Sequence, residues 1–70
     1  MSVSVLVNGE QRQLTGGATV ETLVRSLPGV PAGGGVAVAV EGEIVRRTDW
    51  PTTELAEGAQ VEVVVAVQGG

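Results

Sequence analysis

Apolar and polar residues alternate along the first part of the chain. Three valines there occupy every second position: Val3, Val5 and Val7. This is the period of a strand with one buried face. The pair Asn8-Gly9 follows directly, and it strongly favours a hairpin because both residue types tolerate positive φ. We therefore expect a first strand that ends near Asn8 and a second strand from Gln11 to Leu14, closed by Gly16-Gly17.

The next segment changes to a helical period. Its apolar residues follow the i, i+3, i+4, i+7 spacing of one helix face: Val20, Leu23, Val24 and Leu27. Thr19 suits the N-cap position, and Glu21 suits the positive end of the helix dipole. Pro28-Gly29 should end this helix. Residues 30–35 contain three consecutive glycines without a following Lys-Ser or Lys-Thr pair, so they predict a connecting loop rather than a phosphate-binding loop.

Strand-like alternation returns in the second half. Val36, Val38 and Val40 predict a third strand, Glu41-Gly42 a turn, and Ile44-Val45 a short fourth strand. In the last strand four valines should share one face: Val61, Val63, Val65 and Val67. The predicted order is β-β-α-β-β-β, with one helix available to cover one face of a mixed sheet.

The chain's one aromatic residue lies before the last strand. Because Pro51 disfavours a helical conformation in the residue before it, we expect Trp50 to be non-helical. We interpret Trp50 as an anchor that fills a core of small aliphatic side chains, with Arg47 packing or pairing beside it. Contact with a partner protein is the alternative interpretation.

Composition narrows the function classes. The chain is one short domain of 70 residues with no cysteine and no histidine. Disulfides, the usual zinc sites and Cys-His catalysis are therefore excluded, and we do not expect an enzyme that acts alone. Eight acids against four arginines give a net charge of −4. With no basic patch interleaved with aromatic residues, nucleic-acid binding is not expected, whereas a basic protein partner would suit the acidic surface.

No apolar run is long enough to span a bilayer, and the N-terminus lacks the pattern of a signal peptide. We therefore expect a cytoplasmic protein with no membrane association. The chain also has no lysine, so it cannot form lysine-linked chains on itself, although it could still be attached to another protein.

The end of the chain is unusual for a strand. Gln68 and then Gly69-Gly70 follow the valine-rich segment, and glycine packs no side chain and weakens a strand. We expect a folded domain over residues 1–67 and a flexible tail over residues 68–70. From Ala66 to Gly70 an extended chain reaches about 17 Å, enough to bring the terminal carboxylate into a narrow active site. A frayed end is the alternative interpretation.

The element order and the Gly-Gly end together resemble the β-grasp fold of ubiquitin-like proteins and, more narrowly, the ThiS family of bacterial sulfur carriers. The resemblance covers essentially the whole chain. Eight segments carry it: Val5-Leu6-Val7-Asn8-Gly9-Glu10, Ala18-Thr19-Val20, Val36-Ala37-Val38-Ala39-Val40-Glu41-Gly42, Ile44-Val45, Arg47-Thr48-Asp49-Trp50, Leu55, Glu57-Gly58 and Gly69-Gly70. Three features depart from the family pattern: Arg46 where proline is common, the absence of phenylalanine, and a long glycine stretch at Gly33-Gly34-Gly35.

The resemblance implies an α+β, ubiquitin-like β-grasp fold with a mixed sheet of four to five strands and one helix across one face. It also implies that the Gly70 carboxylate is the reacting group. A ThiF-like adenylating enzyme of the ubiquitin-activating type would use ATP and magnesium to attach AMP to Gly70. A sulfur donor such as a cysteine desulfurase would then convert the adenylate to a thiocarboxylate, and thiazole synthase would receive the sulfur for thiamine. The chain itself would bind no cofactor and no metal.

A docking surface for these partners can be predicted from the strand phases. If the alternating valines from Val3 to Val7 and from Val61 to Val65 form the core, the intervening apolar residues point outward: Leu6, Ala37, Ala39, Val64 and Ala66. Small apolar side chains gathered on one face suggest a docking site, whereas scattered ones are ordinary surface.

Four other functions remain open on the sequence. The chain could be the related carrier of molybdopterin synthesis, or a carrier for cysteine or another sulfur metabolite. It could be a ubiquitin-like modifier joined through Gly70 to lysines of target proteins. It could also be a non-reactive β-grasp interaction module in which Gly-Gly is incidental.

Overall fold

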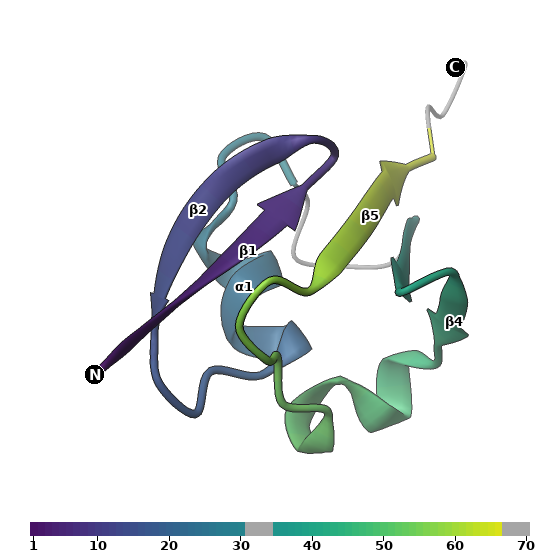
Figure 1. The fold of residues 1–70 in the computed structure, drawn as a ribbon. Helices are drawn as coiled ribbons and strands as arrows, with labels where there is room; N and C mark the ends of the chain where they lie inside the picture. Colours follow the sequence, from purple (N-terminus) through teal and green to yellow (C-terminus); the bar gives the residue numbers. More distant parts are fainter. Residues whose placement is uncertain (31–34, 67–70) are drawn as a thin grey trace.

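The computed structural model describes residues 1–30 and 35–66 of the chain. In this part it contains five strands, one α-helix and one 3₁₀ helix (Figure 1). In chain order these are β1 (Ser2–Val7), β2 (Glu10–Thr15), α1 (Val20–Ser26), β3 (Val36–Val40), β4 (Glu43–Val45), η1 (Arg47–Thr52) and β5 (Gln60–Val65). The predicted order of strands and helix is confirmed.

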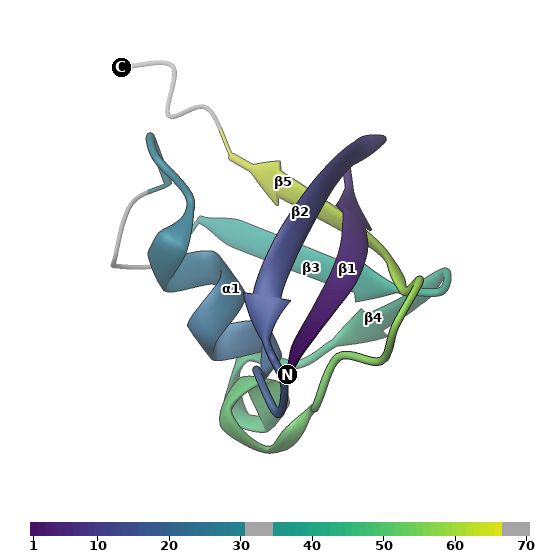
Figure 2. The ribbon, with the colours of Figure 1, turned by 60° about the vertical axis from the view of Figure 1, so that its left-hand side comes forward.

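The five strands form one mixed sheet in the order β2-β1-β5-β3-β4. The central strands β1 and β5 run parallel, with Val7 opposite Val61, and every other neighbouring pair is antiparallel. Helix α1 lies across one face of this sheet (Figure 2). The chain therefore has the two layers of a ubiquitin-like β-grasp fold, as the resemblance implied. The last strand, β5, lies in the middle of the sheet between β1 and β3.

Helix α1 begins and ends where the sequence predicts. The Thr19 Oγ1 accepts a hydrogen bond from the Thr22 backbone N–H at 3.3 Å, which satisfies one of the exposed donors of the first turn. The predicted apolar face points at the sheet, with Val20 and Leu23 fully buried. Leu27 forms the C-cap, directly before Pro28.

The core lies between α1, the inner face of the sheet and η1. Its largest fully buried side chains are aliphatic: Leu23, Val5, Val20, Val38 and Val61. Trp50 closes this core at one side, where its Nε1–H donates to the Val45 carbonyl at 3.0 Å. The Arg47 guanidinium carbon lies 5.2 Å from the centre of the Trp50 ring, within the range of a cation–π contact. The burial of Trp50 and its contact with Arg47 agree with the interpretation of Trp50 as a structural anchor.

Two expectations about local structure are wrong. Trp50 is helical, because it lies in the 3₁₀ helix Arg47–Thr52 together with Pro51. A short 3₁₀ helix contains few backbone hydrogen bonds, so it tolerates the missing N–H of Pro51. Its first turn is closed by a hydrogen bond from the Asp49 N–H to the Arg46 carbonyl. Val3 and Val65 are also not fully buried as the alternation predicted: Val3 is half-buried and Val65 is exposed. Both lie toward the ends of their strands, beyond the fully buried middle of the sheet.

Candidate functional site

The face of the sheet that points away from α1 carries a group of apolar side chains. Strand register places them on one side, since residues that lie opposite each other on neighbouring strands share a face. Ala37 lies opposite Val64, and Ala39 lies opposite both Glu62 and Ile44. Leu6 lies opposite Gln60 on the same face. We call this the outer face, with apolar residues Leu6, Ala37, Ala39, Ile44 and Val64.

The larger apolar residues of the outer face are open to solvent. The exposed fraction is 37% for Leu6, 62% for Val64 and 74% for Ile44. Of the five residues predicted for docking, Leu6, Ala37, Val64 and Ala66 are exposed and Ala39 is half-buried. Four of them lie in strands of this face, and Ala66 lies one residue beyond the end of β5. Their exposure agrees with the predicted strand phases, and their role in docking stays a prediction.

Ile44 is the most exposed of these side chains, and sequence reasoning did not place it on the docking face. Strand β4 has only three residues, so alternation within it is too short to fix which side chains point outward. The turn at Glu41-Gly42 could have predicted the orientation of Ile44. A two-residue turn places Ile44 opposite Ala39, which fixes its face once the face of β3 is known.

The outer face also carries acidic side chains. Glu62 lies on β5 between Gln60 and Val64, directly opposite Ala39, and Glu41 lies at the β3–β4 turn. Five glutamates in the second half of the chain are exposed to solvent: Glu41, Glu43, Glu54, Glu57 and Glu62. Two of them also accept hydrogen bonds, Glu57 from the Ser4 N–H at 2.9 Å and Glu41 from the Gln60 N–H at 2.7 Å. Apolar side chains with negative charge among and beside them suit a protein surface of matching shape and positive charge.

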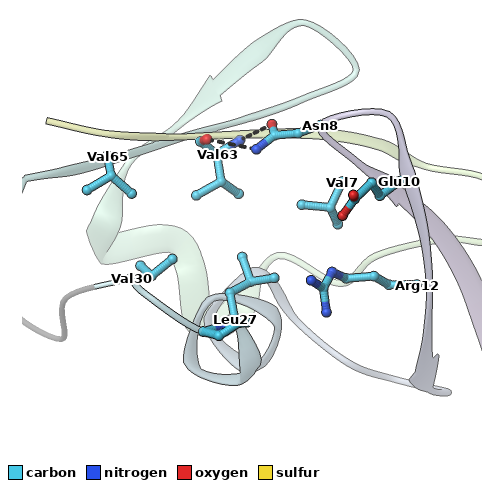
Figure 3. Close-up of a pocket in the computed structure, with 9 residues that line it drawn as sticks. Val7, Asn8, Glu10, Arg12, Leu27, Val30, Val63 and Val65 are labelled. Atoms are coloured by element: carbon cyan, nitrogen blue, oxygen red, sulfur yellow. Dashed lines mark hydrogen bonds between the residues drawn. The ribbon is translucent and has the colours of Figure 1, made fainter.

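A shallow groove lies on the other side of β5, beside the end of α1 (Figure 3). Its volume is about 180 Å³, and its walls are mostly aliphatic, with Leu27 and Val30 facing Val63 and Val65. Arg12 and Glu10 lie at one end of it. In the described part of the chain no group of three or more acidic, cysteine or histidine side chains could hold a metal ion. No helix there is long and apolar enough to cross a membrane.

The chain is firmly held up to the point where the predicted tail begins. β5 pairs with β3 as far as Val65, which lies opposite Val36. One residue later the Ala66 N–H donates to the Gly35 carbonyl at 2.6 Å. The predicted tail and reacting residues Gln68, Gly69 and Gly70 lie outside the described residues, as does Val67. A central strand of the sheet thus leads directly into the segment predicted to carry the chemistry.

This sheet, with its parallel central pair and single covering helix, defines a ubiquitin-like β-grasp protein. The chain belongs to the ThiS family, whose family model matches residues 5–70. It is also similar to the solved crystal structure of a thiamine biosynthesis protein (ThiS) from Geobacter metallireducens. The identity is 27% and the TM-score 0.76, over 97% of this chain and 100% of that one. No curated protein matches the chain.

Proposed function

We propose that this protein is a sulfur carrier of thiamine biosynthesis that reacts through the carboxylate of Gly70. The family match carries the proposal, because it spans residues 5–70 and so includes the Gly-Gly end as well as the folded domain. The likeness to the thiamine biosynthesis protein from Geobacter metallireducens supports the same pathway.

The reaction must solve one chemical problem. A carboxylate is a poor acceptor of nucleophiles at neutral pH, because its charge repels them and oxide is a poor leaving group. In the proposed first step a Gly70 carboxylate oxygen attacks the α-phosphorus of ATP, and pyrophosphate leaves. In the second step sulfide attacks the acyl carbon and AMP leaves, which produces the thiocarboxylate directly. If the donor instead carries a persulfide, its terminal sulfur attacks and AMP leaves, which gives an acyl disulfide. A thiol then cleaves that disulfide, releases the thiocarboxylate and forms a new disulfide with the donor cysteine, which supplies the two electrons.

This chain supplies the reacting group and its support. A ThiF-like adenylating enzyme would bind ATP and magnesium and supply the acid–base groups. A cysteine desulfurase would provide sulfur, and thiazole synthase would accept it. This division of work fits a chain without cysteine or histidine. It also fits a reactive end that follows a strand held in the centre of a sheet, since a fixed starting point limits the positions that the tail must search.

The outer face is the surface that we propose for docking the adenylating enzyme. Leu6 and Val64 lie on the two central strands of the sheet, and Ile44 extends the apolar area to the edge strand β4. Between them Ala37 and Ala39 have short side chains, which lets a partner approach the sheet backbone closely. Ala66 continues this surface toward the tail, so one partner could hold the face and receive Gly70 at once.

The first test is exchange of labelled pyrophosphate into ATP by an adenylating enzyme of the ThiF type. We expect exchange that depends on this protein and is lost when Gly70 is deleted. Absence of exchange with the complete chain, by an enzyme that is active on its own carrier, would contradict the proposal. If exchange occurs and cells then contain this chain linked to lysines of other proteins, the modifier function would be favoured instead.

A further inference from the structure

The two sides of β5 are paired over different lengths. On one side β3 pairs with it from Val61 to Val65, along nearly its whole length. On the other side the parallel ladder with β1 contains two pairs and ends where Val7 lies opposite Val61. The half of β5 that leads into the tail therefore has a neighbouring strand on one side only.

The hydrogen bonds on the β1 side of β5 show which of its backbone groups have no partner in β1. The carbonyls of Ala59 and Val61 accept from β1 and the following turn, through the N–H groups of Leu6 and Asn8, both at 2.9 Å. Because backbone groups in a strand alternate in direction, those of Val63 point to this same side. Without β1 beside it, Val63 needs another partner for its N–H and its carbonyl.

The side chain of Asn8 supplies both partners. Its Oδ1 accepts from the Val63 N–H at 2.9 Å, and its Nδ2 donates to the Val63 carbonyl at 3.1 Å (Figure 3). Asn8 is the first residue of the β1–β2 turn, with φ of +52°, a conformation that asparagine tolerates better than most residues. Its amide thus replaces a strand residue and continues the pairing on the β1 side as far as Val63.

We propose that Asn8 is a positioning residue for the carrier reaction. By bonding both backbone groups of Val63, it fixes the direction in which β5 presents the end of the chain to the adenylating enzyme. This inference rests on the proposed function, since it requires that Gly70 enters an active site. Small displacements of a reacting group are costly to rate, so loosening the strand before the tail should slow adenylation without weakening docking.

The chain contains a matched control at the opposite end of β5. Glu41 is also the first residue of a two-residue turn, with φ of +51°. Its N–H donates to the Gln60 carbonyl at 2.8 Å, and its Oε2 accepts from the Gln60 N–H at 2.7 Å. Glu41 therefore holds the start of β5 much as Asn8 holds its later half. Loss of its side chain should loosen the strand far from the tail.

The test compares N8G with E41G in the complete chain. Glycine keeps the positive φ of each turn and removes only the side-chain bonds. Hydrogen exchange of the Val63 amide should become faster in N8G and stay unchanged in E41G. In the pyrophosphate exchange assay we expect N8G to lower kcat about tenfold, with KM within about twofold of the parent value. E41G also removes a charge beside the proposed docking surface, so its KM is expected to change, whereas its kcat should stay within about twofold of the parent value.

A third variant, N8D, should have an intermediate effect on kcat. N8D can still accept from the Val63 N–H but cannot donate to its carbonyl, so its kcat should lie between the parent and N8G. If N8G is too unstable to assay, N8D against E41G serves the same comparison. A normal kcat in the asparagine variants, an equal loss in E41G, or an unchanged Val63 amide would overturn the inference. A parent chain that is not adenylated at all would instead contradict the proposed function, and the inference with it.

Discussion

The two faces of the sheet are built from nearly the same residues and have opposite environments. On β5, Val61 and Val63 point toward α1, and their side chains are 1% and 8% exposed. Val64 belongs to the same strand but points to the outer face, and it is 62% exposed. On β3 the buried Val38 alternates with Ala37 and Ala39 of the outer face. Hydrophobicity alone therefore does not separate the side chains that stabilise the domain from those that are available to a partner. Strand phase does.

The outer face also differs from the inner one in how it would tolerate change. Inner side chains are packed against α1 and η1, so any change in volume or polarity is transmitted to the core. Outer side chains face solvent, and changes there should affect binding more than stability. Substitutions at neighbouring positions can separate these two effects.

The largest effect is expected from a pair of substitutions on β3. V38D places a carboxylate where the native side chain is completely buried, and an unpaired charge there should cost more than about 4 kcal/mol of unfolding free energy. A37D adds the same group to the exposed face and should cost less than about 1 kcal/mol. Urea unfolding followed by circular dichroism measures both. Similar losses from the two variants would mean that the faces are assigned incorrectly.

Trp50 tests the inner face at its border. W50A removes a large buried side chain and its hydrogen bond to the Val45 carbonyl, and should lower the free energy of unfolding by about 3–5 kcal/mol. W50F keeps most of the apolar contact and loses the hydrogen bond, for about 1 kcal/mol or somewhat more. Chemical unfolding followed by circular dichroism distinguishes them. A stable W50A that fails to bind the adenylating enzyme would favour the partner-contact interpretation.

A substitution in the tail can separate its contribution to function from those of the two sheet faces. G69A adds a methyl group to the segment that we propose enters a narrow active site, and it restricts φ there. We expect adenylation to slow about a hundredfold, with unfolding free energy unchanged. Pyrophosphate exchange gives the rate, and a thermal melt gives the stability. Turnover at the parent rate would remove the reason for a glycine tail.

The smallest of these effects is expected on the outer face. V64E places a charge in the centre of the proposed docking surface and should raise Kd for the adenylating enzyme about tenfold, with stability changed by less than about 1 kcal/mol. Q13E adds the same charge on the distant strand β2 and serves as the control. Calorimetric titration measures both affinities. Equal affinities for V64E and the parent chain would exclude the centre of the outer face as the docking surface.

Much of this architecture follows from local patterns. The valine alternation fixed the strands and most of their faces, and the spacing from Val20 to Leu27 fixed the helix and its buried side. These patterns work because burial of one face imposes period 2 on a strand and period 3.6 on a helix. Val65 is exposed although its position in the alternation predicts burial, because it is the last residue of β5 and lies beyond the fully buried part of that strand.

The remaining features depend on contacts between distant segments. Asn8-Gly9 predicts a turn, but the bonds from Asn8 to Val63 join residues 55 positions apart and depend on how β1 and β5 align. The outward orientation of Ile44 depends on its register with Ala39, because β4 is too short to show a period. The 3₁₀ helix through Trp50 and Pro51 is stabilised by burial of the indole, which outweighs the local preference against it.

The most direct test of the proposed function is the intact mass of the protein after incubation with ATP, magnesium, a ThiF-like adenylating enzyme and a sulfide source. We expect a gain that corresponds to replacement of one oxygen by sulfur, located at Gly70 by fragmentation and absent when Gly70 is deleted. Because oxidation of Met1 adds nearly the same mass, the product should also react with an alkylating reagent specific for the thiocarboxylate. An unchanged mass, under conditions in which the enzyme converts its own carrier, would contradict the sulfur-carrier function.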